Sequence, residues 1–382
     1  MRQSRPRYRV AVVLGHDQDV ESWRLRHRAG EVADGTPYGY DAADEVFEMR
    51  WSVAHAERPV VRRIRARLVS ALGFDLVHAW RNRRLIRWAD VVWTHTEREH
   101  LAVAAVQALR PRRRTPVLAQ SVWLWDRWPT WGATRRALVA RLLRTHPVEC
   151  THSRVNREIS AATVPGRRVI VLPFGTTVPA LDPSSAGAPG DRSGRPLVLA
   201  LGNDVDRDWD LFLAVTEQLP ELDFRIACHR RSIREMPWPA HVSCGPAASR
   251  AEVDELFGDA AVVAVPLRPN RHASGATTCI EATGAGRPVV ATATGGIEDY
   301  LPPETDLVTV GDVDGWVRAL REVVGSPATV DARFVLRHGL TQRDYVARYV
   351  ALTWDLLGVA PADDGVSQFR SAGDQWPQAA VE

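Results

Sequence analysis

The stretch that decides the fold covers residues 273–301 and reads ASGATTCIEATGAGRPVVATATGGIEDYL. It begins with small and hydroxyl-bearing residues, continues as a helix-like segment that contains one carboxylate, Glu281, and ends in an apolar run at 289–292 followed by two glycines. An apolar run at 261–266 precedes it. A strand, a helix and a second strand in this order are typical of a parallel α/β sheet. The role of a carboxylate among Ala, Cys and Ile is the first question that the stretch raises.

Short apolar runs alternate with helix-like segments along most of the chain. The runs are rich in Val and Leu and apolar on both faces, as buried parallel strands are. We expect strands at 8–14, 90–94, 116–122, 148–151 and 169–173, and a second series at 197–201, 224–228, 242–244, 261–266, 289–292 and 307–310. The alternation predicts two doubly wound α/β sheets.

The segment between the two series, residues 179–196, is rich in Pro, Gly and Ser and lacks periodicity, which is typical of a linker. We therefore expect an N-terminal domain over 1–178 and a C-terminal domain over 197–340. A last helix is expected over 341–358, and a disordered polar tail over 359–382.

Charge divides the chain in the same way. All 49 basic residues are Arg, and residues 1–180 hold 31 of them against 17 Asp and Glu, a net charge of +14. The remainder carries a net charge of −11, so the halves are expected to have different partners, with an anionic one for the first half. The four cysteines are scattered and form no CxxC pair, which indicates neither a zinc site nor a disulfide framework. No secretion signal and no membrane-spanning stretch is visible, so we expect a cytoplasmic protein.

The start of the helix in the opening stretch predicts an anion site. Ser274 is a natural N-cap, and Gly275 lets a ligand approach the backbone. The amides of the first turn, with the hydroxyls of Thr277 and Thr278, suit a phosphate or diphosphate. Glu281, about a turn and a half further on, suits a ribose diol. The alternative is an ordinary capped helix with Glu281 on a hydrated face.

Arg207 follows the strand at 197–201 and is placed to meet a phosphate at a strand end. The alternative is a surface Arg paired with Asp206 or Asp208. Several common motifs are absent: the run at 8–14 is followed by GHDQD and not by GxGxxG, and there is no Walker P-loop, HExxH or GxSxG. These absences argue against a nicotinamide enzyme, an NTPase, a zincin and a serine hydrolase.

The stretch 273–301, together with LGNDVDRDWDLFLA at 201–214, resembles the donor half of family four retaining glycosyltransferases of the GT-B fold. The resemblance implies two Rossmann-like domains facing a central crevice. It also implies that Glu281 holds the ribose of a nucleotide-sugar donor. The diphosphate would be held by Gly15, Arg207, Arg271, Ser274, Gly275, Ala276, Thr277 and Thr278.

The chain departs from the family pattern at two positions. The family often has a second glutamate where this chain has Ala273, and an arginine where it has Asn203. The missing arginine leaves more of the diphosphate charge to Arg207, helped by Arg268 or Arg271. The fold requires no metal site. Asp204 and Asp206 show a DxD-like spacing, but we interpret them as loop residues and expect neither metal nor cofactor.

The N-terminal half offers candidates for catalysis and acceptor binding. Similar proteins often carry a histidine after the strand at 90–94, and His95 stands there, where it could hydrogen-bond the transferring sugar or the acceptor hydroxyl. Glu97 or Glu99 could orient it, and otherwise His95 is a satisfied loop histidine. Four tryptophans lie at 123–131, where they would bind sugar rings or form a core cluster. The acceptor candidates are His16, Asp17, Trp123 and Trp125.

The helix expected at 58–72 is basic and amphipathic, with Val61, Ile64, Leu68 and Leu72 along one stripe. Such a helix either packs on a core or lies on an anionic membrane. The overall prediction is a retaining glycosyltransferase that uses a nucleotide-sugar donor and a saccharide, lipid-linked or small-molecule acceptor, in the cytoplasm or peripheral on the inner face of the cell membrane. The alternatives are a nucleotide-sugar epimerase or hydrolase, or a catalytically silent partner protein of this fold. Nucleic acid is not an expected partner.

Overall fold

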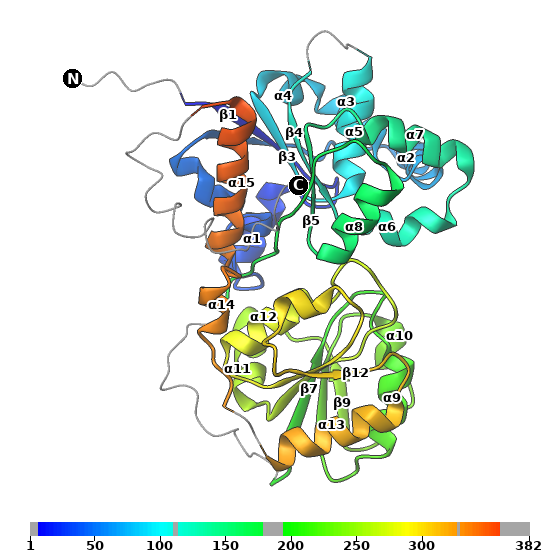
Figure 1. Ribbon diagram of the computed structural model, residues 1–382, viewed down its shortest axis with the longest axis vertical. Helices are drawn as coiled ribbons and strands as arrows, with labels where there is room; N and C mark the ends of the chain where they lie inside the picture. The colour runs from blue at the N-terminus through cyan, green and yellow to red at the C-terminus, as the bar shows by residue number, and fades with distance from the viewer. Residues whose placement is uncertain (1–6, 110–113, 179–193, 327–328, 360–382) are drawn as a thin grey trace, which may run out of the picture. The chain divides into compact units, whose positions relative to one another are not determined.

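The computed structural model describes residues 7–109, 114–178, 194–326 and 329–359 (Figure 1). The chain forms two compact units. Among the described residues, unit 1 comprises 7–28, 34–173 and 343–359, and unit 2 comprises 29–33 and 174–342. Most of the predicted linker, 179–193, and nearly all of the predicted tail, 360–382, lie outside the described residues.

Unit 1 contains a six-stranded sheet in the order β2-β1-β3-β4-β5-β6, and every pair in it is parallel. The strands are β1 (Arg9–Val13), β2 (Glu48–Trp51), β3 (Val91–Thr94), β4 (Val117–Ser121), β5 (Val148–Thr151) and β6 (Val169–Val171). The helices are α1 (Val20–Arg28), α2 (Pro59–Leu72), α3 (Leu76–Arg81), α4 (Arg83–Trp88), α5 (Glu97–Ala108), α6 (Leu124–Arg127), α7 (Ala133–Leu143), α8 (Arg154–Thr163) and α15 (Gln342–Leu357). Two 3-10 helices are η1 (Pro37–Glu45) and η2 (Trp128–Thr130).

The five strands expected in the N-terminal half are present, with ends that shift by a few residues. The sequence did not predict β2, because its four residues, EMRW, form no apolar run: charged, exposed side chains alternate with apolar, half-buried ones. β2 is an edge strand that pairs only with β1, so it needs no apolar outer face.

The last helix, α15, completes the core of unit 1. Trp93 Nε1 on β3 donates a hydrogen bond to Thr353 Oγ1 at 2.8 Å, and the Tyr349 hydroxyl donates to the Thr94 carbonyl at 2.9 Å. The side chains of Trp93, Tyr345 and Tyr349 are all fully buried. The carboxyl end of β3 therefore depends on a segment about 250 residues away in the chain.

Unit 2 contains a second all-parallel sheet, in the order β12-β11-β10-β7-β8-β9. Its strands are β7 (Leu197–Leu201), β8 (Asp223–Ala227), β9 (Val242–Gly245), β10 (Val262–Val265), β11 (Val289–Thr292) and β12 (Asp306–Val308). Its helices are α9 (Trp209–Glu217), α10 (Arg231–Arg234), α11 (Arg250–Asp259), α12 (Ala276–Gly284), α13 (Val313–Gly325) and α14 (Phe334–Arg337), with the 3-10 helix η3 (Ile297–Tyr300).

Helices cover both faces of the unit 2 sheet. Phe212 of α9 and Trp316 of α13 pack on Val198 and Ala264, which lie on one face of β7 and β10. α11 and α12 pack against the other face (Figure 1). The loops after β7 and β10 meet at the carboxyl edge of the sheet, since Arg207 and Leu267 form an isolated antiparallel bridge there. Ligands bind at this edge in open α/β sheets.

The face that α2 turns inward differs from the predicted stripe. Val61, Val69 and Leu72 are half-buried, whereas Ile64 and Leu68 are exposed. Arg65 lies on the inner face instead, because its guanidinium pairs with Glu57 at 2.9 Å and with Asp75 at 2.5 Å. Across the described parts of the chain, no helix has the length and apolar character to cross a membrane.

Candidate functional site

A cavity of about 340 Å³ opens where β7 and β8 end and α12 begins. Four residues of the predicted donor site line it: Arg207, Gly275, Thr277 and Thr278. The other lining residues are Leu201, Gly202, Asn203, Asp204, Ala227, His229, Ala247 and Val253. The loop after β7, the end of β8 and the start of α12 thus form one hollow within unit 2.

Arg207 forms a buried wall of this cavity, with only 3% of its surface exposed. Its Nε donates to the Leu201 carbonyl at 2.9 Å, and its Nη2 donates to Thr278 Oγ1 at 3.1 Å. Its Nη1 is buried and has no hydrogen-bond partner among the described residues. Burial lowers the pKa of Arg207 from its ordinary value, but a guanidinium stays protonated at neutral pH. A buried cation with a spare donor is suited to an anionic ligand.

Two glycines make room for this guanidinium. A Cβ on Gly275 would lie 2.6 Å from Arg207 Nη1 and 2.7 Å from Val265 Cγ1, and a Cβ on Gly202 would collide with Arg207 Nε. Both glycines have positive φ, +148° at Gly202 and +89° at Gly275. The sequence predicted Gly275 as a point of close ligand approach, and the structure shows in addition that the glycine accommodates Arg207.

The prediction that Ser274 caps α12 is wrong. Gly275 occupies the N-cap position with no side-chain cap, and the helix starts at Ala276. Ser274 Oγ donates instead to Asp204 Oδ2 at 2.8 Å, so this hydroxyl tethers the two loops. The reason lies in the backbone before the helix, where Ala273 adopts a left-handed φ of 56° and redirects the chain.

Glu281 lies inside α12, 7% exposed, and its carboxylate accepts a hydrogen bond from Arg250 Nη1 at the start of α11. Arg250 Nε also donates to Asp254 Oδ1 at 2.9 Å. The hydrated face that one interpretation gave to Glu281 is therefore wrong, because the carboxylate is buried in an ion pair. Glu281 is not among the residues that line the cavity, and neither are Arg271, Ser274 and Ala276.

The interpretation of Arg207 as a surface residue paired with Asp206 or Asp208 is also wrong, since the side chain is buried and donates its hydrogen bonds to Leu201 and Thr278. The guanidinium that does pair with Asp208 and Asp210 belongs to Arg268, whose side chain is 48% exposed. Arg268 is thus engaged outside the cavity.

In unit 1, His95 follows β3 and is buried among aromatic rings. Its Nδ1 lies 3.2 Å from the hydroxyls of both Tyr40 and Tyr345, and the ring of Tyr38 stacks on it with 3.2 Å between centroids. Burial, with His152 nearby, lowers the pKa of His95 well below its ordinary 6.5, so the imidazole is neutral at pH 7. Tyr38 has a left-handed φ of 62°, a costly conformation for an aromatic residue.

Glu97 and Glu99, which were predicted to orient His95, bind other groups. Glu99 accepts from the Thr96 amide and hydroxyl in a capping box, and Glu97 accepts from the Val122 and Trp123 amides at 3.2 and 3.1 Å. Both carboxylates are held by helix α5 and the loop after β4. Tyr40 and Tyr345 take the orienting position, and sequence reasoning missed them because η1 and α15 are far from β3 in the chain.

The acceptor candidates divide into two groups. Trp125 is fully buried and donates from Nε1 to Glu149 Oε1 at 3.1 Å, so it is a core residue and the acceptor role predicted for it is wrong. Trp123 is half-buried, and the Arg127 guanidinium lies 5.9 Å from its ring. Gly15 and His16 are half-buried, and Asp17 is exposed, in the loop after β1. His16 Nε2 lies 3.2 Å from the His55 carbonyl.

Sequence reasoning missed a group of potential metal ligands in unit 2. Asp204, Asp206 and His272 lie together beside the cavity, with ligand atoms that are all within 4.8 Å of one another. Burial alone would raise the pKa of Asp204, but hydrogen bonds from His272, the Asp206 amide and Ser274 lower it below its ordinary value. The DxD-like spacing was a signal for the two aspartates, whereas His272 is distant in the chain.

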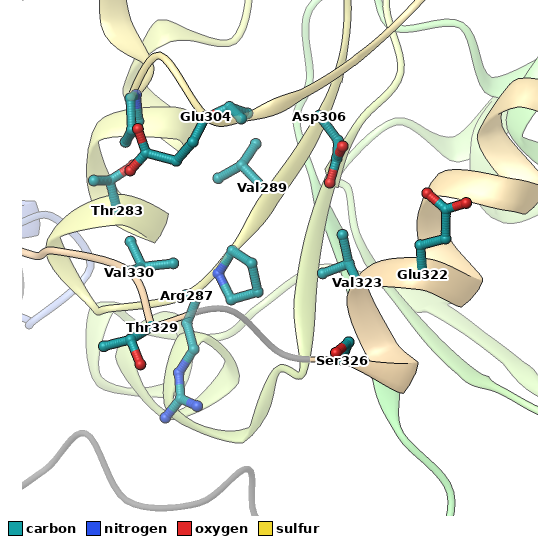
Figure 2. A pocket seen from close by; sticks show the side chains of 13 residues that line it. Thr283, Arg287, Val289, Glu304, Asp306, Glu322, Val323, Ser326, Thr329 and Val330 are labelled. Carbon is teal, nitrogen blue, oxygen red and sulfur yellow. The ribbon is translucent and has the colours of Figure 1, made fainter.

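A second cavity in unit 2, of about 290 Å³, lies at the opposite, amino-terminal edge of the sheet, where β11 and β12 begin (Figure 2). Its walls carry three carboxylates, Glu304, Asp306 and Glu322, and one guanidinium, Arg287. The pKa of Asp306 is raised by burial and by the neighbouring Glu322. An excess of carboxylates disfavours an anionic ligand, so the cavity beside Arg207 is the better candidate for a diphosphate.

The part of the chain that forms the cavity beside Arg207 lies within the range of a known family model. Residues 196–326, about a third of the chain, match the family model described as glycosyl transferases group 1. This range contains Arg207, α12 and Glu281. No curated protein matches the chain by sequence.

Solved structures match more than nine tenths of the chain. Sucrose-phosphate synthase from Thermosynechococcus elongatus has a TM-score of 0.69 at 15% identity, over 92% of this chain and 100% of that one. HepE from Anabaena, in complex with UDP and glucose, has a TM-score of 0.60 at 13% identity, over 91% and 99%. A glycosyltransferase from Rickettsia africae has a TM-score of 0.61 at 10% identity, over 93% and 100%. The α/β fold of the GT-B type predicted from the sequence is confirmed, and residues 196–326 match the glycosyltransferase group 1 model.

Proposed function

We propose that the protein is a glycosyltransferase that moves a sugar from a nucleoside-diphosphate sugar to an acceptor hydroxyl with retention of configuration. The observation that carries the proposal is the buried Arg207 guanidinium, which lines a cavity at a helix start and keeps one donor without a partner among the described residues. The match of residues 196–326 to glycosyl transferases group 1 supports it. So do the structural likenesses, since HepE was solved with UDP-glucose.

In this proposal the diphosphate binds Arg207 and the amides of Gly275 to Thr278. The spare Nη1 of Arg207 supplies a charge-assisted hydrogen bond, and the first turn of α12 supplies the positive end of its dipole. These groups are held in place before the reaction, so they stabilise the charge that develops on the leaving diphosphate. Gly15 and Arg271 are proposed as further diphosphate contacts.

Glu281 is proposed to hold the ribose. The ion pair with Arg250 fixes one oxygen of its carboxylate, and a carboxylate has acceptor capacity for a vicinal diol besides that bond. Arg250 therefore acts as the residue that orients Glu281.

His95 is proposed as the residue of unit 1 that contacts the reacting groups. A neutral imidazole donates one hydrogen bond and accepts another, and Tyr40 and Tyr345 lie at Nδ1. We propose that His95 hydrogen-bonds the transferring sugar or the acceptor hydroxyl. His16, Asp17 and Trp123 are proposed to contact the acceptor, which is a saccharide, a lipid-linked molecule or a small molecule.

A second candidate function is nucleotide-sugar binding without transfer, in a partner protein of the same fold. Ala273 favours it: where the family often has a glutamate, this chain has a methyl group and a left-handed backbone. A nucleotide-sugar epimerase or hydrolase on the same fold is the third possibility.

The binding part of the proposal is tested by calorimetry and thermal shift with a panel of nucleoside diphosphates and their sugars. We expect one base to bind, and Arg207→Gln to weaken that binding about 10- to 100-fold, since a hydrogen bond to a charged group contributes about 1.5–3 kcal/mol. Arg268→Gln is the matched control, because Arg268 pairs with exposed Asp210 outside the cavity. Equal affinity of the Arg207 and Arg268 variants would show that the site is misplaced.

The chemical part is tested by incubation with labelled nucleotide sugars and candidate acceptors. Transfer with retained configuration supports the proposal, and release of a sugar isomer or of free sugar supports the epimerase or hydrolase. Tight binding without turnover supports the silent partner.

The surface of unit 1 supports a proposal on where the protein is located. We propose that the protein is cytoplasmic and contacts the anionic inner face of the cell membrane through α2. This helix buries no residue, presents Val60, Ile64 and Leu68, and carries exposed Arg62, Arg63 and Arg67 beside them.

A further inference from the structure

Three metal-ligating side chains from two loops converge beside Arg207. Asp204 and Asp206 stand in the loop between β7 and α9, and His272 stands in the loop between β10 and α12. His272 Nε2 lies 3.4 Å from Asp204 Oδ2 and 3.6 Å from Asp206 Oδ2. One imidazole nitrogen thus faces two carboxylates that are two residues apart.

These separations are long for ion pairs. A charge-assisted N–H···O bond is about 2.7–2.9 Å long, so contacts of 3.4 and 3.6 Å hold the groups apart. Two ligands on one tetrahedral ion, with bonds of about 2.1 Å, stand about 3.4 Å apart. The spacing between the imidazole and the two carboxylates therefore also fits ligands that share an ion, and the hydrogen bonds from the Asp206 amide and Ser274 Oγ hold the Asp204 carboxylate in place.

The three side chains also have the exposure of an open site. The His272 side chain is 3% exposed, and those of Asp204 and Asp206 are 27% and 26% exposed. A nitrogen ligand approaches from the interior while the carboxylates reach the surface, and Asp204 lines the cavity that contains Arg207. One side of an ion at this position would face that cavity.

Arg207 gives an independent indication of a ligand. Its buried Nη1 has no partner among the described residues and lies in the same cavity wall, which indicates an anion next to Asp204. The diphosphate of a nucleotide sugar carries two negative charges, and the two aspartates add two more, against the positive charges of Arg207 and of Arg271, the further proposed diphosphate contact. Arg230 is half-buried and donates to the Asp204 carbonyl at 3.3 Å. A divalent cation would bring the carboxylates and the diphosphate together instead of leaving them to repel each other.

We propose that Asp204, Asp206 and His272 bind one divalent transition-metal ion of the zinc class. Two carboxylate oxygens and an imidazole nitrogen are a ligand set that such ions accept, and three protein ligands leave a position open. An oxygen of the diphosphate takes that position. This last step rests on the proposed function, whereas the ion site itself does not. The proposal departs from the sequence-based expectation that no metal is used.

The ion site is tested by titrating metal-free full-length protein with Co²⁺ and recording visible absorption, which distinguishes tetrahedral from octahedral coordination. We expect one equivalent to bind with a tetrahedral spectrum, and His272→Gln and Asp206→Asn each to weaken binding at least tenfold. Asp210→Asn is the matched control, because Asp210 is an exposed carboxylate on the same segment that pairs with Arg268 at 2.7 Å. Thermal unfolding of each variant in the presence of a chelator verifies that it is folded.

Absence of Co²⁺ binding, or equal binding by His272→Gln and the Asp210→Asn control, overturns the proposal. The diphosphate step is then tested with UDP, GDP and ADP, with and without Co²⁺. We expect the ion to raise the affinity for one of them at least tenfold in the natural protein and not in His272→Gln. By linkage, that nucleotide raises Co²⁺ affinity by the same factor.

The two proposals fail in different ways. Specific Co²⁺ binding without affinity for any nucleoside diphosphate or its sugar supports the ion site and rejects the proposed function. Nucleotide binding that requires Arg207 but is unchanged by Co²⁺ or chelator supports the donor site and rejects the diphosphate as the ion's fourth ligand.

Discussion

Arg207 keeps its position because two neighbouring residues have no side chain. Replacing Gly275 with Ala places a methyl group 2.6 Å from Arg207 Nη1 and 2.7 Å from Val265 Cγ1, in a backbone with φ of +89°. Strain in the left-handed region costs about 1 kcal/mol, and the collision adds about 1–3 kcal/mol. We expect Gly275→Ala to lower the free energy of unfolding of unit 2 by about 2–4 kcal/mol, measured by urea denaturation, and to weaken nucleotide binding.

Gly286→Ala provides the control for that experiment. Gly286 also has positive φ, +68°, but a Cβ there meets nothing within 4 Å. Backbone strain should therefore lower the free energy of unfolding of Gly286→Ala by only about 1 kcal/mol, and nucleotide binding should be unchanged. Equal losses in the two variants would mean that Arg207 moves aside freely.

At the same scale, the sequence indicated four of the twelve residues that line the cavity but not what holds them. Arg207, Gly275, Thr277 and Thr278 were predicted from their place at strand and helix ends. The capping role of Ser274 was predicted wrongly, because the backbone adopts a left-handed conformation at Ala273. Alanine rarely adopts this conformation, so the sequence gives no sign of the turn. The partners of Glu281 and His95 come from α11, η1 and α15, and sequence spacing does not reveal such distant contacts.

At the scale of the element, α2 presents an apolar stripe to solvent. Val60, Ile64 and Leu68 are 64%, 52% and 40% exposed. We expect the protein to sediment with vesicles that contain anionic lipid, and Ile64→Glu to reduce the bound fraction severalfold, because it puts a negative charge in the apolar face.

Val205→Glu is the control for vesicle binding, since Val205 is 65% exposed but belongs to unit 2. Binding should also fall with rising salt, because the arginines beside the stripe act through screened charge. Unchanged sedimentation of Ile64→Glu would exclude α2 as the contact.

Element prediction succeeded where burial dominates. All eleven predicted strands are present. Central strands such as β3 and β10 are buried along their whole length and must be apolar throughout, whereas the predicted edge strands β6, β9 and β12 are partly exposed but still contain apolar residues. β2 was not predicted, because an edge strand does not have to be apolar on both faces. The inward face of α2 was assigned by apolar spacing alone, and the ion pairs of Arg65 with Glu57 and Asp75 placed a charged residue there.

At the scale of the whole molecule, unit 1 contains four buried histidines with lowered pKa. The pKa falls to about 4 for His78 and about 3 for His146, and lies well below 6.5 for His95 and His100, in each case mainly through burial. The unfolded chain binds these protons more readily, so acidification below about pH 6.5 destabilises unit 1. Glu99 opposes this with one proton, because burial raises its pKa to about 7.

The net difference is about three protons near pH 5.5, so the free energy of unfolding of unit 1 should fall by up to roughly 4 kcal/mol per pH unit there. Hydrogen exchange followed by mass spectrometry at pH 7.5 and 5.5, corrected for intrinsic rates, should show lost protection in α5 but not in α9. In unit 2, half-buried Asp204 has a lowered pKa, so its contribution to stability is lost only at more acidic pH.

His146→Gln tests whether the buried histidines cause the pH dependence of the free energy of unfolding of unit 1. Removing one buried histidine should reduce the pH dependence of unit 1 by about 1.4 kcal/mol per pH unit. A slope equal to that of the natural protein would assign the acid sensitivity to other groups.

The place of α15 in unit 1 has a consequence for synthesis on the ribosome. Unit 2 is nearly continuous in the chain, whereas unit 1 lacks the partners of Trp93 and Thr94 until residues 349–353 emerge. Domains generally fold in the order in which they are made. Here the unit that starts first finishes last, and the nascent sheet around β3 must wait, with its aromatic face uncovered, while the whole of unit 2 is translated.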